Sequence, residues 1–354
     1  MKVGIPKEIK PLEGRVGLVP EACAELVKVG HWVILEQGAG VASGYRDSNY
    51  RDAGVEIVSD AESLYGEAEL VVKVKEPYGP EPEMLREDQL LFCFLHLAAS
   101  KGLTDQLLES GVTGIAFETL EERGLLPILA PMSDIAGRLA VQNGTVLLHH
   151  QLGGKGILLG GLPAAERGHV VILGGGQAGG NAAHLAAAMG ARVTVFDRLR
   201  ERMGAMRDLG DNVTALYPYR DAVSEAVASA DLLIGAVLIP GTKAPKIITR
   251  EQVSSMAAGS VIVDISVDQG GCIETTRATT YQDPTYQVDE VTHFCVTNMP
   301  GAVPRSASQA LSAAMMPYLK RLVGTDWRTD PQLQAAVNLS GGKLIYPALR
   351  EQYL

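Results

Sequence analysis

The chain has 354 residues, of which 46% are hydrophobic and 20% are charged, and its formal net charge is −10. This length is large for one hydrophobic core and predicts two domains, and the composition is that of a globular protein. The negative charge argues against nucleic acid or an anionic membrane as a broad binding partner, although a local basic site stays possible.

Three further features set the expected compartment. No apolar run reaches the roughly 18 residues that a membrane helix needs, and the N-terminal sequence MKVGIPKEIK lacks the apolar centre of a signal peptide. The four cysteines, Cys23, Cys93, Cys272 and Cys295, form no C-x-x-C pair and lie in apolar surroundings. We therefore expect buried free thiols, no metal and a cytoplasmic protein.

The first 127 residues alternate short apolar runs with amphipathic segments. We expect helices over 20–29 and 103–110, and strands over 2–5, 32–35, 70–74, 90–95 and 114–117. Such alternation predicts a parallel sheet covered by helices, and such sheets bind ligands beyond the carboxyl ends of their strands.

The next segment changes character near residue 128. Ser133 and Asp134 indicate the start of a long helix, whose apolar spacing continues to Leu148. A second long helix is expected from Pro304 to Val323. We expect both helices to bridge two domains, one formed by residues 1–127 with 305–354 and the other by residues 128–304.

The segment from 169 to about 300 repeats the strand–helix unit regularly. Its expected strands cover 169–173, 192–196, 213–216, 231–235, 260–264 and 293–297. Six strands in two halves are typical of a complete dinucleotide-binding domain. The predicted fold class is therefore α/β, with two doubly wound parallel-sheet domains, of which the second is a Rossmann domain, joined by long bridging helices.

A glycine motif follows the first strand of this second domain. Gly174, Gly176 and Gly179 fit G-x-G-x-x-G between an apolar strand and a small-residue helix. Gly174 permits the tight turn, Gly176 the approach of a pyrophosphate, and Gly179 the packing of helix against strand. Free N–H groups at the helix start attract the phosphates. The alternative, an ordinary tight turn, does not explain the acidic residue that follows.

That acidic residue is Asp197, which ends the next expected strand roughly 20 residues after the glycines, as a dinucleotide site requires. Asp197 is expected to accept hydrogen bonds from the adenosine ribose. Arg198 and Arg200 flank it and can tolerate a 2′-phosphate, but the carboxylate repels that group. The sequence therefore favours NAD as the cofactor.

The first domain places three basic side chains just after expected strands. Arg15 lies in the loop after the first strand, Lys75 directly follows the strand 70–74, and His96 ends the strand 90–95. Each cation could be an ordinary surface charge or could bind a substrate carboxylate. His96 could be a hydrogen-bonded core histidine or a general acid–base group.

A second acidic site follows the strand 260–264. Asp264 ends this strand, and Asp268 lies in the loop beyond it, on the side where a nicotinamide would project. The alternative for Asp268 is a structural acid that caps the turn at Gly270. Asn298 and Met299 also follow a strand end.

The motifs together resemble the alanine dehydrogenase family, and also the nucleotide-binding component of the nicotinamide transhydrogenases. The resemblance extends over essentially the full chain. It is carried by the sequences GIPKEIKPLEGRVGLVP, VVKVKEP, FLHLAAS, LAPMSDIAGRLA, GGKGILLGGLP, VVILGGGQAGGNAA, IGAVLIPGTKAPK, VDISVDQGGCIETTRATTY and VTNMPGAVP.

The resemblance implies roles at matching positions. Arg15 and Lys75 would bind the substrate, and His96 and Asp268 would be catalytic acid–base groups. The NAD site would add residues from several segments: Ser133, Gln177, Ala178, Asp197, Arg202, Val237, Leu238, Ile265, Arg277, Val296, Thr297, Asn298 and Met299. The implied reaction is the NAD-dependent interconversion of L-alanine with pyruvate and ammonia, by a homo-oligomer, namely a homohexamer.

Two departures and three alternatives stay open. Pro218 stands where a polar residue often approaches the adenosine, and Ser266 stands at a position that is commonly alanine. The chain could instead be the hydride-transferring component of a transhydrogenase, a dehydrogenase for another small amino acid, or a non-catalytic NAD-binding protein. A sensor of the last kind need not keep Arg15, Lys75, His96 and Asp268 together.

Overall fold

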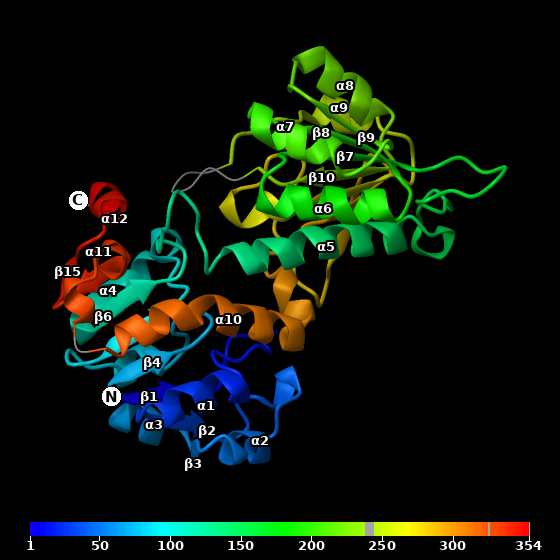
Figure 1. Ribbon diagram of the computed structural model, residues 1–354. Helices are drawn as coiled ribbons and strands as arrows, with labels where there is room; N and C mark the ends of the chain where they lie inside the picture. The colour runs from blue at the N-terminus through cyan, green and yellow to red at the C-terminus, as the bar shows by residue number, and fades with distance from the viewer. Residues whose placement is uncertain (238–243, 325, 354) are drawn as a thin grey trace. The chain divides into compact units, whose positions relative to one another are not determined.

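The computed structural model describes residues 1–237, 244–324 and 326–353. The chain forms two compact units, the first made of Met1–Met132 and Val303–Leu354 and the second of Ser133–Ala302. The chain passes from the first unit to the second within one long helix, α5 (Ala130–Leu147), and returns just before another, α10 (Pro304–Leu322). Figure 1 follows the chain through both units.

The first unit is built on an eight-stranded sheet in the order β15-β14-β6-β5-β4-β1-β2-β3. Six strands are mutually parallel, and β14 and β15 continue the sheet, each antiparallel to the strand before it. The bounds are β1 (Lys2–Ile5), β2 (Trp32–Glu36), β3 (Glu56–Val58), β4 (Leu70–Val72), β5 (Leu90–Cys93), β6 (Thr113–Ala116), β14 (Val337–Ser340) and β15 (Lys343–Leu344). Read from β3, the parallel strands follow the doubly wound order 3-2-1-4-5-6, which reverses between β1 and β4.

The helices of the first unit are α1 (Pro20–Lys28), α2 (Asp47–Asp52), α3 (Ala61–Glu67), α4 (Lys101–Ser110), α10, α11 (Pro331–Ala335) and α12 (Pro347–Tyr353). Their starts follow ordinary capping chemistry. The Asp60 carboxylate accepts the Ser63 N–H at 2.8 Å at the start of α3, and Pro304 occupies the first turn of α10, where no intrahelical N–H bond is lost. A buried cluster that includes Val71, Leu91 and Leu107 joins the sheet to α3 and α4.

The second unit contains a seven-stranded sheet in the order β12-β13-β11-β10-β7-β8-β9. Its strands are β7 (His169–Leu173), β8 (Arg192–Phe196), β9 (Val213–Leu216), β10 (Leu232–Gly235), β11 (Val261–Asp264), β12 (Thr285–Val288) and β13 (Val291–Phe294). All pair in parallel except β12, which runs antiparallel to β13. From β9 to β13 the order is again 3-2-1-4-5-6, the order of a Rossmann domain.

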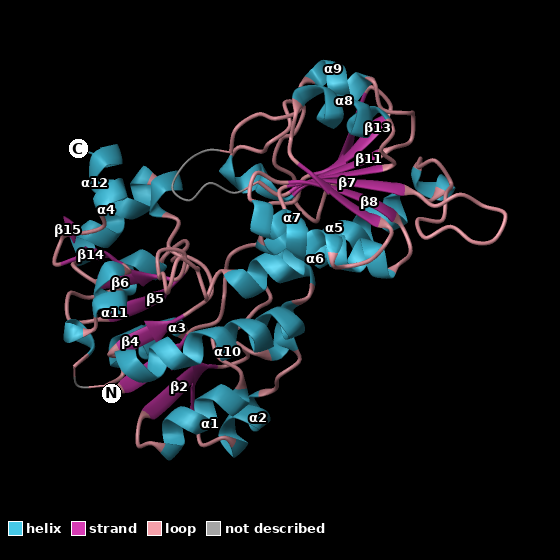
Figure 2. Cartoon of the chain, turned by 45° about the horizontal axis from the view of Figure 1, so that its top comes forward, coloured by secondary structure: helices cyan, strands magenta, loops and turns pink. Residues whose placement is uncertain are grey.

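Both faces of this second sheet are covered, as Figure 2 shows, by α5 and α6 (Gln177–Ala188) on one side and by α8 (Arg220–Ala228) and α9 (Arg250–Ser254) on the other. A further helix, α7 (Arg200–Arg207), lies between β8 and β9 in the chain. Alternate strand residues serve the two faces, because successive side chains point to opposite sides of a strand. Val171 and Leu233 belong to the cluster that contains Val223 of α8, whereas Ile172 and Leu232 lie against glycines of α6 and α5.

The structure confirms the fold class and adjusts several expected bounds. The strand expected over 293–297 is β13, which ends at Phe294, so that His293 is fully buried inside the strand and does not begin it. The helix expected to start at Ser133 starts at Ala130. The antiparallel pairings of β12, β14 and β15 make both sheets mixed, where purely parallel sheets were expected. All four cysteines are buried free thiols.

Candidate active site

Three predicted residues lie at the carboxyl edge of the first sheet. Arg15 lies in the loop after β1, Lys75 follows β4 and His96 follows β5. β1, β4 and β5 are neighbours in the sheet, and the strand order reverses between β1 and β4. A strand-order reversal opens a crevice at the carboxyl ends, where α/β sheets bind their ligands. The sheet topology therefore brings these three residues to one edge of the first unit.

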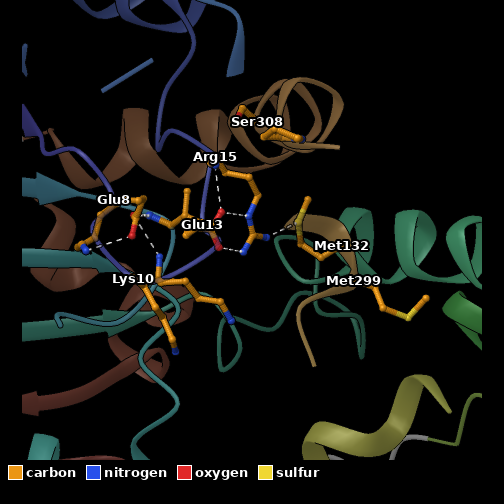
Figure 3. A network of polar contacts seen from close by, with 12 residues as sticks. Glu8, Lys10, Glu13, Arg15, Met132, Met299 and Ser308 are labelled. Carbon is orange, nitrogen blue, oxygen red and sulfur yellow. Dashed lines mark hydrogen bonds and ion pairs between the residues drawn. The ribbon is translucent and has the colours of Figure 1, made fainter. Parts of the chain in front are cut away.

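Arg15 is almost fully buried and is paired with Glu13. Arg15 donates through Nε to one Glu13 oxygen at 2.7 Å and through Nη2 to the other at 2.6 Å, and its Nη1 lies 3.2 Å from the Met132 sulfur. Figure 3 shows this fork between the two side chains. A two-point contact of this kind fixes the plane of the guanidinium group. A cavity of about 210 Å³ lies beside Arg15, Glu13 and Glu8.

Lys75 is half-buried and differs sharply from Lys73, two residues earlier. Lys73 is fully buried and forms ion pairs with Glu8 at 3.2 Å and Glu81 at 2.9 Å. Among the residues that the structure describes, no carboxylate lies within ion-pair distance of the Lys75 ammonium group. Burial lowers the pKa of Lys75, and the nearby charge of Arg15 lowers it further. Lys75 is thus a cation beside a second cation, an arrangement that favours an anionic ligand.

His96 is held from two sides. Its Nδ1 lies 3.2 Å from a Glu76 oxygen, and its backbone N–H donates to Glu118 at 2.6 Å. The backbone is left-handed, with φ of 48°, and the ring stacks on Phe94 with centroids 5.6 Å apart. Its side chain is 39% exposed, so the alternative of a buried core histidine does not apply. One ring nitrogen is therefore fixed by a carboxylate while the ring stays accessible.

The second unit carries the glycine turn at the end of β7. Gly174 has φ of +94°, and a Cβ there would lie 2.6 Å from the Ala236 carbonyl oxygen. A Cβ on Gly179 would lie only 1.8 Å from the Gly174 carbonyl oxygen. Gly176 is the N-terminal cap of α6, and a Cβ there would project toward Arg202. The turn brings the backbone close to the start of α6, whose first-turn N–H groups lack intrahelical partners. This geometry fits a pyrophosphate group.

Asp197 follows β8 and lies beside this turn. One of its oxygens accepts the Gly175 N–H at 2.7 Å, the other accepts the Leu199 N–H at 2.8 Å, and Arg202 lies 3.5 Å away. The carboxylate is buried and is oriented by the backbone. Because each carboxylate oxygen has further acceptor capacity, Asp197 can still bind a ribose hydroxyl.

Asp268 lies in the short helix Ile265–Gln269 that follows β11, and it is exposed. The fully buried Asp264 organises this segment by accepting the Ser266 N–H at 3.0 Å, the Cys272 N–H at 3.0 Å and the Thr276 hydroxyl at 2.7 Å. Burial raises the pKa of Asp264, although these hydrogen bonds oppose the shift. Asp264 is therefore the structural acid of the loop, and Asp268 is the acid that faces solvent.

Most of the remaining predicted residues lie at five places in the second unit. Ser133 is in the first residues of α5; Gln177 and Ala178 begin α6; Val237 and Ile265 follow β10 and β11; Val296, Thr297, Asn298 and Met299 follow β13. All these strand ends lie on the carboxyl edge of one sheet. Arg277 instead stacks over the Tyr286 ring at 4.1 Å. The predicted residue Leu238 lies outside the described residues.

Several residues that shape the site were missed by the sequence analysis. Glu13 pairs with Arg15, Glu76 contacts His96, and Glu118 binds the His96 backbone. On α5, Gly137 lies so close to α6 that a Cβ would be 2.0 Å from the Ala178 carbonyl oxygen. The position of Glu76, next to Lys75 at the same strand end, was the one signal that could have pointed to it. No cluster of three or more metal-binding side chains occurs in the described part of the chain.

Together, the two doubly wound sheets and the residues at their carboxyl edges define the class of two-domain α/β dehydrogenases. The family model "Alanine dehydrogenase/PNT, N-terminal domain" matches residues 4–136, and the corresponding C-terminal domain model matches residues 140–347. The chain therefore belongs to the alanine dehydrogenase/PNT family. Among the described residues, none of the helices has both the length and the apolar character needed to span a membrane.

Individual relatives agree with this assignment. An alanine dehydrogenase of Mycolicibacterium smegmatis is 47% identical over 99% of this chain and 96% of that relative. A solved L-alanine dehydrogenase is also 47% identical, with a TM-score of 0.96 over 100% of this chain and 99% of the other. A transhydrogenase from Sinorhizobium meliloti is 26% identical, with a TM-score of 0.85 over 98% of this chain and 100% of the other.

Proposed function

We propose that this enzyme interconverts L-alanine and water with pyruvate and ammonia, using NAD as the hydride acceptor. The observation that carries the proposal is the full-length similarity to alanine dehydrogenases at 47% identity. The cluster of Arg15, Lys75 and His96 at one sheet edge supports it, because these groups suit an amino-acid carboxylate and a proton transfer. The first unit is the proposed substrate domain, and the second is the proposed NAD domain.

The proposed NAD site rests on the glycine turn. The N–H groups at the start of α6 would hold the pyrophosphate, and Asp197 would hold the adenosine ribose. The other proposed contacts are Ser133, Gln177, Ala178, Arg202, Val237, Leu238, Ile265, Arg277 and the segment 296–299. When bound, the nicotinamide accepts the hydride from the substrate Cα. Asp197 would repel a 2′-phosphate, so NAD is preferred over NADP.

In the proposed mechanism, this chain's own residues orient the amino acid and move protons. Arg15 and Lys75 bind the carboxylate, which places Cα and restricts its motion. Loss of the hydride from the neutral amine of the substrate leaves an iminium ion. His96 takes a proton from the water that adds to the iminium carbon, which gives a carbinolamine. His96 then passes this proton to the nitrogen, and ammonia leaves as Asp268 accepts the proton of the carbinolamine hydroxyl. Asp268 is the second proposed acid–base group. Proton transfers of this kind contribute about 10²–10⁴-fold to the rate.

We further propose that the enzyme is a cytoplasmic homohexamer. Support for self-association comes from the segment between α5 and β7, which extends away from the sheet of its unit (Figure 1). Its Leu152, Leu158 and Leu162 side chains are 50%, 56% and 56% exposed. Apolar side chains gathered on one exposed segment are typical of subunit contacts.

Three other functions compete with this proposal. A transhydrogenase component is supported by the solved transhydrogenase, but at 26% identity against 47% for the L-alanine dehydrogenase. A dehydrogenase for another small amino acid would keep the same residues and differ only in pocket size. A non-catalytic NAD-binding protein would have no need of the acid–base pair.

One assay separates these functions. The purified protein is mixed with each of a panel of amino acids and with NAD or NADP, and reduced cofactor is followed at its absorption band. We expect turnover with L-alanine and NAD, and at least about a tenfold preference over NADP because Asp197 disfavours the 2′-phosphate. Turnover with another amino acid alone would refute the substrate and retain the class. Hydride exchange between two nicotinamide cofactors without any amino acid would favour the transhydrogenase.

A further inference from the structure

Glu76 is not among the residues that either the motifs or the family resemblance assigned to the reaction. It lies next to Lys75 in the segment after β4, and its side chain is 15% exposed. One carboxylate oxygen lies 3.2 Å from Nδ1 of His96, and the other forms an ion pair with Lys10. The residue therefore joins the loop after β1, the end of β4 and the end of β5.

Glu76 carries the negative charge that a partner of a protonated His96 ring needs. Burial would raise the pKa of this carboxyl group, but the hydrogen bond and charge of His96, the bond to Lys10 and the charge of Lys75 outweigh burial and lower the pKa. Glu76 is thus ionised throughout the neutral range. An ionised carboxylate only accepts hydrogen bonds, so the His96 Nδ1 must carry the proton in this contact.

The opposite ring nitrogen is consequently the one that changes its protonation. With Nδ1–H directed at Glu76, the neutral ring has its lone pair on Nε2. No hydrogen-bond partner of Nε2 occurs among the residues that the structure describes. The ring stacks on Phe94, and Glu118 holds the backbone of His96, so the segment that carries the ring is fixed. The geometry fixes one tautomer and presents Nε2 outward.

We infer that Glu76 is a positioning residue for the acid–base reaction: it holds His96 in the tautomer whose Nε2 accepts a proton, and it stabilises the imidazolium that results. This inference rests on the proposed role of His96. Carboxylates that orient a catalytic histidine act in this way, and their neutral amide analogues favour the wrong tautomer. Lys10 in turn holds the second oxygen of Glu76, which keeps the carboxylate from swinging away.

The test uses the full-length protein with Glu76→Gln, which preserves the shape of the side chain. Glu83→Gln removes one carboxylate from an exposed position of the same unit and is the matched control. We expect Glu76→Gln to lower kcat about 10–100-fold, with KM for L-alanine changed less than about threefold. Glu83→Gln should leave both constants unchanged. NADH binding, followed by fluorescence, should be unaffected in both variants and reports that each is folded.

The pH profile separates this role from a merely structural one. In the oxidative direction His96 must be neutral to accept a proton, and Glu76 favours the charged ring. The other charged groups around the pair, Lys10, Lys75 and Glu118, are unchanged in Glu76→Gln. The pH at which activity falls to half on the acidic side should therefore move to a lower value. A loss of kcat with no movement of this midpoint would overturn the inference.

A double-mutant cycle completes the test. If Glu76 acts through His96, then Glu76→Gln should cost nothing further in a His96→Ala background. If the losses of kcat from the two substitutions multiplied in the double variant, the role of Glu76 would be overturned, while the proposed role of His96 would stand. Wild-type turnover of His96→Ala would overturn the proposed role of His96 and this inference with it. If Glu76→Gln fails to bind NADH, Glu76→Asp replaces it, because the shorter carboxylate keeps the charge but loses contact with Nδ1. Its profile should shift in the same direction by less, and no shift would contradict the inference.

Discussion

Two lysines at the end of β4 have opposite electrostatic environments. Lys73 is compensated by Glu8 and Glu81, and these two carboxylates also accept backbone N–H groups of the following segment, including Val74 at 2.6 Å and Tyr78 at 2.7 Å. The buried cluster therefore shapes the loop that carries Lys75 and Glu76. Lys75 forms no ion pair with a described residue, and the charges of Glu76 and Glu13 only partly oppose the effect of burial and of Arg15. A binding site commonly keeps this kind of unfavourable charge at the expense of stability.

We predict that Lys75→Met raises the midpoint of thermal unfolding by about 2–4 °C while lowering alanine turnover at least about 100-fold. Burial and Arg15 lower the pKa of Lys75 in the folded state, so its charged form is disfavoured there. That penalty exists below the folded pKa and fades as the pH rises toward the unfolded pKa near 10.4. Methionine keeps the alkyl chain and removes the penalty at neutral pH. Thermal scans and the NADH assay check both effects.

The comparison for this prediction is Lys73→Met. That change leaves Glu8 and Glu81 buried without their counter-charge, so it should destabilise the protein by about 3–5 kcal/mol. A Lys75→Met protein that unfolds at a lower temperature than the wild type would show that Lys75 has a stabilising partner and would contradict the argument.

Among the elements, those with a buried apolar run were predictable from sequence. The strands β7 and β10 are buried at every residue, and both were expected within one residue of their bounds. The edge strands β3 and β12 were missed because β3 buries only Val58 and β12 buries none of its residues completely, so neither shows apolar periodicity. Such edge strands form because they pair with a neighbouring strand, and the pattern of apolar residues within the segment carries no information about that pairing.

The same distinction applies to the candidate site. Arg15, Lys75, His96 and Asp197 were found because each follows an apolar strand. Their partners were not found, because a contact such as Glu76 to His96 joins residues 20 apart and has no local signature. Gly137 is similar: it is a small residue inside a helix, and only the tertiary packing of α5 on α6 shows why a larger one would not fit.

We predict that Gly137→Ala weakens NADH binding at least about tenfold and lowers the unfolding midpoint. The new Cβ would lie 2.0 Å from the Ala178 carbonyl oxygen, so the first turn of α6 must move, and this turn is the proposed pyrophosphate site. Fluorescence titration with NADH measures the change. Gly204→Ala in α7 is the control, because no atom lies within 4 Å of its added Cβ. It should bind NADH normally and be more stable by about 0.5–1 kcal/mol. Equal affinities for the two variants would refute the packing argument.

At the scale of the whole molecule, acid stability depends on buried histidines that have no proposed role in the reaction. His169 and His293 of the second unit are 4% and 0% exposed. Burial lowers the pKa of both, and the charge of Arg192 adds to the effect at His169. The His293 ring is hydrogen-bonded to the Val291 carbonyl at 3.0 Å and to the Thr275 hydroxyl at 2.8 Å, so both nitrogens of a neutral ring have hydrogen-bond partners. Protonation of either ring is therefore opposed by the fold.

The sign of the pH dependence follows from these shifts. Above about pH 6.5 both rings are neutral in the folded and unfolded states, and they add no pH dependence. As the pH falls below that value, the two histidines become protonated in the unfolded chain but stay neutral in the folded chain. This difference continues until the pH reaches their lowered pKa in the folded state. Each histidine should then remove about 1.4 kcal/mol of stability per pH unit. Burial raises the pKa of Glu8 and of Asp264, which acts in the opposite sense at lower pH.

We therefore predict that His293→Gln flattens the loss of stability between pH 6.5 and 5.5 by up to about 1.4 kcal/mol per pH unit, whatever its effect at neutral pH. Urea unfolding at half-unit pH steps gives the slope for each variant. His149→Gln, at an exposed position, should keep the wild-type slope. A His293→Gln slope equal to that of the wild type would mean that His293 binds its proton equally well in both states. In that case burial would not disfavour the charged ring at this position.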